Sequence, residues 1–541
     1  MFILERIGAF FQGGFAWFMT ILVTACNIMN LPFDFGGVHG AFKNLAYTFA
    51  YSTEKIQPDG ILGTMRDMRV TMGKNEREGF QFVLRGRYEA SLQYCFELSE
   101  VKNESGDTIP IHMFKEHYIY AGVNQLAGTY PDALVPYAPN QNRLEITTPH
   151  KNQGYYFELR TAADTPAGTY TGKIKIVQRE EQDGYVWVTL ATLVEAPFTV
   201  EVVDVTFPEA PYSDTAVGLG GGQFHALNGG GDYGALYQQY YDYLLDHKLS
   251  AYSLPYDILD PRADDYMSDP RVTSFQIPYP WGDDAALQAY YNKVQSNPIW
   301  ARKGFFYPID EPHHADQIQT YREITDRLTA LCPGYHMVTP FYTWKFSEDG
   351  KDFDNFDIQK RRSDILCPIS SIFAESGFPA ALRKSVKDNG SRAWWYVCCG
   401  PTGDFCNMFI HLQGTRHRLL FWQQYQNSVT GLLYWHTTYW DKANPWYSSV
   451  TWNSFESCGD GSWLYPGRPV GVDGPVPSLR LKNIADGLED YDLLCMAEAK
   501  LGRAYCEKKA AQLSASLTSY TLSPAKIESV RAGILRDLAK G

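Results

Sequence analysis

The sequence predicts a two-part fold, an N-terminal β-sandwich followed by a (β/α)8 barrel. Residues 48–205 contain short β-branched or aromatic runs separated by turn signals, which is typical of a sandwich. After Pro208 and Pro211, apolar strand-like runs alternate with longer helical patterns, which favours parallel βα units. This alternation extends to residue 503, a span that fits the ~250 residues usual for such a barrel.

The sandwich strands are predicted where β-branched and aromatic residues lie between turns such as 105–107, 166–168 and 183–184. They are residues 69–71, 79–84, 94–98, 155–159, 172–177, 185–193 and 198–203.

Eight apolar runs are predicted to form the barrel strands, in the order 217–221, 249–255, 273–280, 305–310, 336–342, 365–372, 393–399 and 432–439. Helical patterns are expected at 232–247, 283–295, 314–331, 380–388, 414–428, 478–501 and 525–540, whereas the Asp- and Pro-rich link 257–270 indicates a loop without a full helix. The predicted division is an apolar N-terminal segment (1–40), the sandwich (41–207), the barrel (208–503) and a C-terminal helical extension (504–541).

Composition limits the classes of function. The formal net charge of −13 argues against a nucleic-acid surface. Aromatic residues make up 15% of the chain, which fits either large cores or rings that stack on sugar faces. The 10 cysteines form no CxxC pair, so we expect mostly buried, reduced thiols, which favours a cytoplasmic protein.

The N-terminus favours a different location. No charged residue occurs from Ile7 to Phe33, and Val23–Cys26 resembles a lipoprotein cleavage box. The alternatives are therefore a membrane-anchored or exported protein and an apolar helix packed on the body. Membrane contact is expected only through residues 7–33, and the oligomeric state stays open.

Two adjacent carboxylates, Asp310 and Glu311, end the fourth predicted barrel strand. In such barrels the functional residues lie at the carboxyl ends of the strands. One interpretation is an N-cap for the helix that begins near His313. The other is a catalytic pair, because a single cap does not need two acids.

Glycoside hydrolysis gives such a pair two separate tasks. One carboxylic acid must protonate the leaving oxygen, and the oxocarbenium-like carbon must be stabilised. Adjacent side chains cannot flank one bond with the ~5–5.5 Å separation of an ordinary retaining pair unless the backbone turns sharply. Our hypothesis is that Glu311 is the acid/base and that Asp310 orients a 2-acetamido group of the substrate, which attacks the anomeric carbon itself.

Several short segments, in this order along the chain, resemble glycoside hydrolase family 123. They are 75–81 (NEREGFQ), 168–172 (GTYTG), 307–312 (YPIDEP), 394–399 (WWYVCC), 431–435 (GLLYW), 459–467 (GDGSWLYPG), 477–481 (PSLRL) and 486–491 (DGLEDY). The resemblance implies a β-sandwich on a (β/α)8 barrel. It also implies exo-acting β-N-acetylgalactosaminidase activity by substrate-assisted catalysis, with Asp310 and Glu311 as the catalytic pair and a glycan or glycolipid-derived substrate.

Further candidates follow from position at strand ends. Because strand residues alternate between two faces, about half of the aromatic residues there must be structural. Trp344 and Trp435 are the preferred sugar platforms, and Tyr342 and Tyr434 are candidate donors to the acetamido oxygen. The complete predicted substrate-binding set is His225, Tyr342, Trp344, Trp395, Tyr434, Trp435 and Asp460.

Other polar residues have structural interpretations. Arg480 is a candidate for hydroxyl recognition, but a solvated ion pair at a surface helix is the stronger reading. The cluster Glu76–Glu78 is expected to form an ion-pair network at the domain junction. No cofactor is expected, and no spaced set of His, Asp and Glu predicts a metal.

Two alternatives stay open. A glycosidase of other specificity could use a separate carboxylate nucleophile such as Glu375, just after the sixth predicted strand. The chain could also be a non-catalytic carbohydrate-binding protein on the same fold.

Overall fold

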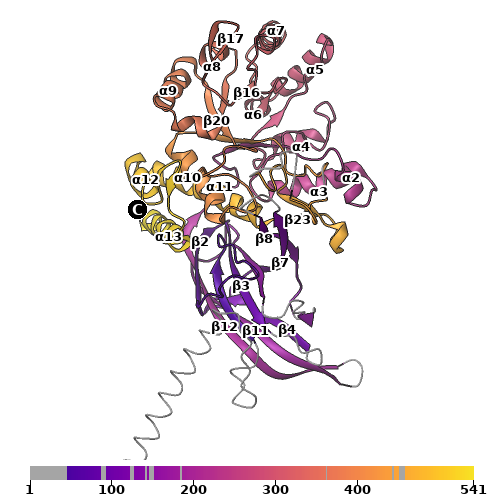
Figure 1. Ribbon diagram of the computed structural model, residues 1–541, viewed down its shortest axis with the longest axis vertical. Coiled ribbons are helices and arrows are strands. Elements are labelled where there is room, and N and C mark those ends of the chain that lie inside the picture. Colours follow the sequence, from indigo (N-terminus) through magenta and orange to yellow (C-terminus); the bar gives the residue numbers. More distant parts are fainter. Residues whose placement is uncertain are drawn as a thin grey trace, which may run out of the picture.

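The computed structural model describes residues 45–86, 93–121, 127–139, 143–144, 151–182, 186–360, 362–441, 444–449 and 457–540. The apolar segment 1–40, with Cys26, lies outside these residues. Within these ranges no helix has both the length and the apolar character needed to cross a membrane. Figure 1 shows the N-terminal strands below and the mixed helices and strands of the C-terminal half above them.

The N-terminal half consists of two facing sheets. The first has the order β1 (Leu45–Tyr51), β3 (Arg77–Gly86), β10 (Asn152–Arg160), β7 (Ile111–Ala121) and β8 (Gly128–Pro136). The second has the order β2 (Met68–Lys74), β12 (Val186–Thr206), β11 (Gly168–Gln182), β4 (Gln93–Leu98) and β9 (Arg143–Leu144), with β5 (Val101–Lys102) and β6 (Thr108–Ile109) at its side.

Aromatic rings fill the space between the two sheets. Phe80 stacks on Phe157 of the neighbouring strand at 5.3 Å and packs against Phe198 of the opposite sheet at 5.0 Å. Phe80 and Phe82 share one face of β3 because strand residues two apart point the same way.

The predicted strands differ from the observed ones in two ways. The two expected strands at 185–193 and 198–203 are one continuous strand, β12. Strands β1, β5, β6, β7, β8 and β9 were not predicted. In β7, Lys115 and Glu116 interrupt the apolar run, so its alternation is hard to see in the sequence.

The C-terminal half is built on a parallel sheet with the order β13 (Asp214–Val217), β21 (Gly431–Tyr434), β20 (Arg392–Tyr396), β19 (Ile365–Pro368) and β16 (Val338–Phe341). A separate parallel pair joins β14 (Phe275–Gln276) to β15 (Gly304–Phe305). Each of these strands overlaps or adjoins a run predicted from the sequence, although most are shorter.

Helices separate the strands of this half. They are α2 (Phe224–Leu227), α3 (Tyr233–Leu245), α4 (Ala263–Ser268), α5 (Asp284–Gln295), α6 (Pro298–Lys303), α7 (Ala315–Leu331), α8 (Asn355–Gln359), η3 (Ser370–Ala374), α9 (Phe378–Asn389), α10 (Gly414–Gln426), α11 (Leu479–Leu501), α12 (Arg503–Ala510) and α13 (Pro524–Lys540). Short elements complete it: β17 (Lys345–Glu348), β18 (Lys351–Asp354), β22 (Leu464–Pro466), η4 (Arg468–Val470), β23 (Pro475–Pro477), β24 (Ser514–Ser516) and β25 (Ser519–Tyr520).

Side-chain caps explain where the longer helices begin. Asp232 accepts hydrogen bonds from two backbone amides at the start of α3, and Asp283 accepts one at the start of α5. Ser478 does the same for α11. Each cap satisfies amides that have no partner within the helix, so these helix starts were readable from the sequence.

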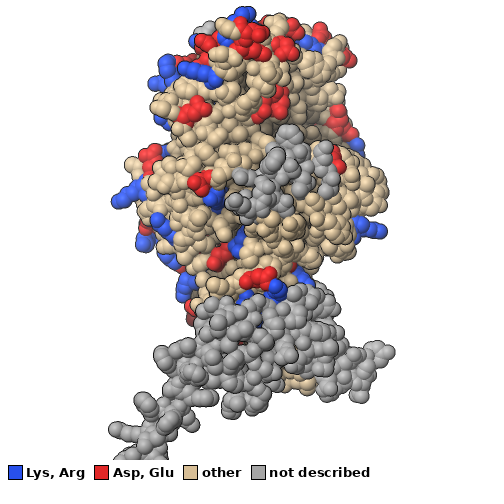
Figure 2. Space-filling view, in the orientation of Figure 1, with Lys and Arg blue, Asp and Glu red and all other residues tan. Residues whose placement is uncertain are grey.

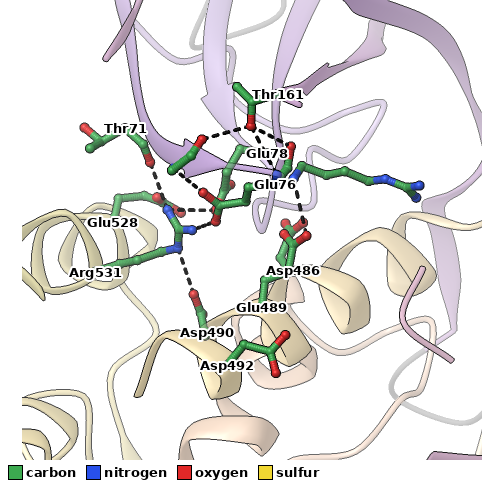
Figure 3. Close-up of polar contacts among 12 residues, drawn as sticks. Thr71, Glu76, Glu78, Thr161, Asp486, Glu489, Asp490, Asp492, Glu528 and Arg531 are labelled. Atoms are coloured by element: carbon green, nitrogen blue, oxygen red, sulfur yellow. Dashed lines mark hydrogen bonds and ion pairs between the residues drawn. The ribbon is translucent and has the colours of Figure 1, made fainter. Parts of the chain in front are cut away.

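Buried ion pairs join the two halves (Figure 3). Arg531 of α13 pairs with Asp490 of α11 at 2.9 Å and with Glu78 of β3 at 3.2 Å. Arg418 of α10 pairs with the same two carboxylates, both at 2.7 Å. Glu76 also pairs with Arg531. The cluster Glu76–Glu78 thus takes part in the ion-pair network that was expected at the junction.

Arg480 corrects one expectation. It is fully buried and pairs with Asp132 of β8 at 2.8 Å, so its ion pair is not solvated. The physical reason is that the start of α11 docks against β8, where Ala133 bridges to Ser478.

On the face shown in Figure 2, acidic and basic side chains are interspersed over the C-terminal half.

Candidate active site

Asp310 and Glu311 follow β15 in the chain. They lie beyond the last backbone contact between this segment and the residues at β16. Phe306 still donates a backbone hydrogen bond to His336 at 2.8 Å. Glu311 then has a φ of +42°, in the left-handed region that residues other than glycine seldom adopt. Strained backbone of this kind is concentrated at functional sites. The chain therefore makes a sharp local turn at the two adjacent carboxylates.

Neither carboxylate caps the following helix. The N-cap of α7 is His314, and Gln317 accepts from the backbone amides of His313 and His314. Glu348 accepts from the amide of Ala315. The capping interpretation of the acidic pair is therefore wrong, because other side chains hold these amides.

Each member of the pair has its own tyrosine. Tyr307 donates to Asp310 Oδ1 at 2.7 Å, and Tyr396 of β20 donates to Glu311 Oε1. Asp310 is exposed, whereas Glu311 is half-buried. Burial raises the pKa of the Glu311 carboxyl; the hydrogen bond from Tyr396 lowers it, and the charge of Asp310 raises it. Two carboxyls in such different environments can take different roles.

Residues from three other strand ends lie within electrostatic range of the pair. Burial and the charge of Asp310 raise the pKa of Tyr252 to about 12. Burial and the charge of Glu311 raise the pKa of Tyr342. Burial and both charges raise the pKa of Cys367.

A second polar group is formed by Asp460 with two aromatic residues at the end of β21. Tyr434 and the indole N–H of Trp435 both donate to Asp460 Oδ1, at 2.8 and 3.1 Å. Burial raises the pKa of Asp460 to about 6, against these hydrogen bonds, which lower it. Tyr252 connects this group to the carboxylate pair. Its hydroxyl donates to the carbonyl of Trp435 at 3.0 Å, and its pKa is raised by burial and by the charge of Asp310.

Trp435 is the partly exposed member of this group, while Tyr434 is fully buried and stacked on Trp463 at 4.0 Å. A side chain at Gly461 would come within 2.3 Å of the Trp435 ring, and the residue has a φ of +71°. Glycine at 461 therefore allows the indole to reach Asp460. Of these three side chains, Trp435 is the one whose ring can contact a ligand. Asp460 accepts the hydrogen bond of the indole, and Tyr434 donates to the same carboxylate oxygen.

Tyr342 and Trp344 follow β16. The Tyr342 ring is 42% exposed and lies 5.0 Å from the ring of His313, whose Nδ1 is 2.6 Å from the Glu311 carbonyl. Trp344 is half-buried against Phe378 at 5.6 Å. Tyr342 thus lies beside the pair, and Trp344 lies in the same loop but packs largely on helix α9.

Two predicted residues do not face the carboxylates. Trp395 is fully buried and donates to Gln424 of α10 at 3.1 Å, so it packs between strand and helix. His225 is tied to its own loop, with Nε2 2.9 Å from the carbonyl of Gly231. Trp395 thus lies on the opposite face of β20 from Tyr396, because side chains alternate along a strand.

Sequence reasoning missed Tyr252, Tyr307 and Tyr396. Strand register was the only available signal: Trp394 packs on Phe305 at 5.6 Å, and Tyr396, two residues on, shares its face. Among the described residues, no group of three or more His, Cys, Asp or Glu is placed to hold a metal ion.

A half-buried acid beside a second, exposed carboxylate supplies the groups that glycoside hydrolysis requires. Residues 286–497 match the model of the glycoside hydrolase 123 catalytic domain. The chain is therefore a glycoside hydrolase, and its residues 286–497 are similar to the catalytic domain of glycoside hydrolase family 123. No curated protein matches the chain.

A solved family 123 structure shows a similar fold. A family 123 glycoside hydrolase from Clostridium perfringens, described in an analysis of glycolipid glycan hydrolysis, is 12% identical with a TM-score of 0.65, covering 92% of this chain and 99% of that one. A β-D-glucuronidase from Dictyoglomus thermophilum is 8% identical with a TM-score of 0.28, covering 85% and 75%.

Proposed function

We propose that the chain is an exo-acting, retaining β-N-acetylgalactosaminidase that uses substrate-assisted catalysis. The observation that carries the proposal is the adjacent pair Asp310 and Glu311, separated by a left-handed turn and held in different environments. The turn and the two environments fit an arrangement in which Glu311 meets the leaving oxygen and Asp310 meets the substrate's own nucleophile.

In the proposed reaction, protonated Glu311 donates its proton to the leaving oxygen. The carbonyl oxygen of the 2-acetamido group attacks the anomeric carbon, forming an oxazolinium intermediate as the glycosidic bond breaks. Asp310 accepts the acetamido N–H hydrogen bond and offsets the positive charge. Glu311, now ionised, takes a proton from water as that water opens the intermediate, which retains the configuration.

The substrate is proposed to be a glycan or a glycolipid-derived glycan. The supporting likeness is the Clostridium perfringens enzyme, whose description names glycolipid glycan hydrolysis. Trp435, held by Asp460, is the proposed platform under the sugar, and Tyr342 is a proposed hydrogen-bond donor. Trp344, Tyr434 and His225 remain weaker candidates because each is engaged in local packing or bonding.

We infer that the two halves are a β-sandwich and a complete (β/α)8 barrel. Beyond the five-stranded sheet, single parallel bridges join Val217 to Ala251 and Phe306 to Met337. Gln276 donates to Tyr252 at 2.7 Å, next to the β14–β15 pair. These connections run in parallel from β13 around to β21, which supports closure.

The alternative with a separate nucleophile has less support. Glu375 is exposed, and no side-chain contact with Asp310 or Glu311 is found for it among the described residues. A non-catalytic binding protein would not need the acid whose pKa burial raises at position 311.

An aryl β-N-acetylgalactosaminide assay with matched amide variants tests the proposal. Glu311→Gln should lower kcat by about 10²–10⁴, the usual contribution of general acid–base catalysis. Asp310→Asn should lower kcat by about 10²–10³, as does the loss of one group that stabilises the transition-state charge. Glu375→Gln, an exposed change of the same kind, should keep wild-type activity. Loss of activity in Glu375→Gln would favour the separate nucleophile, and equal activity in Glu311→Gln would refute the proposed acid.

A second arm tests the substrate's own group. A substrate without the 2-acetamido group should be cleaved at least a hundredfold more slowly, and a thiazoline mimic of the intermediate should inhibit. Equal rates on both substrates would contradict substrate assistance. Including the glucosamine epimer reports the preferred sugar.

We propose a cytoplasmic location, with an anchored or exported protein as the alternative. Lipidation of Cys26 would establish the alternative, and Met1 retained on a soluble protein would exclude it.

A further inference from the structure

A cavity of about 490 Å³ lies at the seam between the two halves. Its walls include Arg77 at the start of β3, Asp246 and Lys248 after α3, Arg271 before β14 and Glu489 of α11. Lys248 and Arg271 precede the strand-like residue Ala251 and strand β14, so the cavity adjoins the amino ends of the parallel strands. Asp310 and Glu311 lie beyond the carboxyl end of β15, which places the cavity away from the candidate active site.

The cavity lining contains charged side chains of both signs. Arg77, Arg160, Lys248 and Arg271 contribute four cations. Three of these cations pair with carboxylates that do not line the cavity: Glu158 with Arg160 at 2.7 Å, Asp492 with Lys248 at 3.0 Å, and Asp269 with Arg271 at 2.7 Å.

The lining also contains four carboxylates, those of Glu76, Glu209, Asp246 and Glu489. Asp246 is shared, at 3.7 Å from Arg77 and 3.3 Å from Arg271. Glu209 is exposed, and Glu76 is engaged by the amide of Gly73 and by Arg531.

Three polar atoms of the lining are buried without a hydrogen-bond partner among the described residues, and one of them, Glu76 Oε1, forms the ion pair with Arg531. The other two are Arg77 Nη1 and Glu489 Oε2. Glu489 is only 4% exposed, and its other oxygen accepts from the Arg77 amide at 3.3 Å. Figure 3 shows Glu489 on α11 facing the sandwich residues Glu76 and Glu78. A buried polar atom left unpaired is costly, which marks these two as atoms prepared for a ligand.

We propose that this seam cavity is a second binding site, for a small polar molecule that carries an oxyanion, either a carboxylate or a phosphate. The unpartnered N–H of Arg77 donates to the anion, and the protonated carboxyl of Glu489 supplies a second donor. Burial raises the pKa of Glu489 to about 8, with Asp486 raising it and Lys248 and Arg77 lowering it, so the carboxyl can be neutral when the anion binds. The volume suits a monosaccharide-sized ligand.

Isothermal titration of the full chain tests the site with two probes, inorganic phosphate and glucuronate. We expect one of them to bind with a submillimolar Kd. Arg77→Met should weaken this binding at least tenfold, whereas Arg262→Met, an exposed arginine outside the cavity, should not change it. Glu311→Gln should bind the probe as wild type does.

The two probes distinguish a free phosphate from an acidic sugar as the source of the anion. Failure of both to bind, equal binding by Arg77→Met, or loss of binding in Glu311→Gln would overturn the proposal. Should Arg77→Met not fold, Glu489→Gln provides the test. At pH 8.5 the wild-type protein should take up a proton when the probe binds, whereas Glu489→Gln should take up none. Titrations in buffers with different heats of ionisation measure this proton uptake. Equal uptake by both would also overturn it.

Discussion

At the scale of single residues, strand register decides which aromatic side chain meets the catalytic acid. Trp395 and Tyr396 are neighbours in β20, yet Trp395 donates to Gln424 on α10 and Tyr396 donates to Glu311. The sequence placed both at the right strand end but offered no means to tell the two faces apart. A strand shifted by one residue exchanges every side chain between faces.

Trp395→Phe should therefore leave kcat and KM unchanged and lower the free energy of unfolding by about 1–3 kcal/mol, since Gln424 loses its buried donor. Trp435→Phe should raise KM because the ring that faces the site loses its hold on Asp460. Steady-state kinetics and urea unfolding of both variants check these two predictions. A raised KM in Trp395→Phe with an unchanged KM in Trp435→Phe would reverse our assignment.

The pH dependence should depend on Tyr396. The Tyr396 hydroxyl stabilises ionised Glu311 and so lowers the pKa of that carboxyl. Tyr396→Phe removes this effect, the pKa rises, and Glu311 stays protonated to higher pH. The alkaline limb of kcat/KM, which reports the free acid, should therefore move to higher pH. Tyr342→Phe serves as the control and should leave the limb in place; a shift to lower pH in Tyr396→Phe would contradict the assigned hydrogen bond.

At the scale of secondary structure, helix α13 connects the two halves through ion pairs. Its Arg531 is 1% exposed and reaches Asp490 of α11 and Glu78 of β3, while its Arg536 forms an exposed pair with Glu201 of β12. The amphipathic pattern predicted this helix, but nothing local showed that one arginine would be buried among carboxylates.

Arg531→Met should lower the free energy of unfolding by about 3–5 kcal/mol, because it leaves buried carboxylates without their partner. Arg536→Met on the same helix should cost about 0–1 kcal/mol, as exposed pairs do. Denaturant titration of the two variants compares a buried and an exposed pair on one helix. Equal losses would show that the burial of Arg531 does not matter.

At the scale of the whole molecule, the junction holds carboxyls that are hard to ionise. Burial raises the pKa of Asp486 to about 7 and that of Glu489 to about 8. In the unfolded chain such groups titrate near ~4. Between these limits the folded protein binds more protons than the unfolded chain, so stability falls as pH rises through this window and levels off above it.

The free energy of unfolding should consequently be lower at pH 8.5 than at pH 6.5. Asp486→Asn removes one of the titrating groups and should reduce that difference. Chemical denaturation at the two pH values measures it. A protein more stable at pH 8.5, or an undiminished difference in the variant, would mean that these carboxyls do not control the pH response.

The sequence by itself determined the order of the parallel strands and long helices in the C-terminal half, the starts of the capped helices and the acidic pair. Periodicity, caps and apolar runs are local properties, and Asp310 and Glu311 are adjacent in the chain. Only the tertiary structure decided which residues surround them. Tyr252, Tyr396 and Asp460 come from separate segments, Trp395 turns away, and the burial that raises the pKa of Glu311 arises from packing between segments. The seam cavity likewise exists only where two halves of the chain meet.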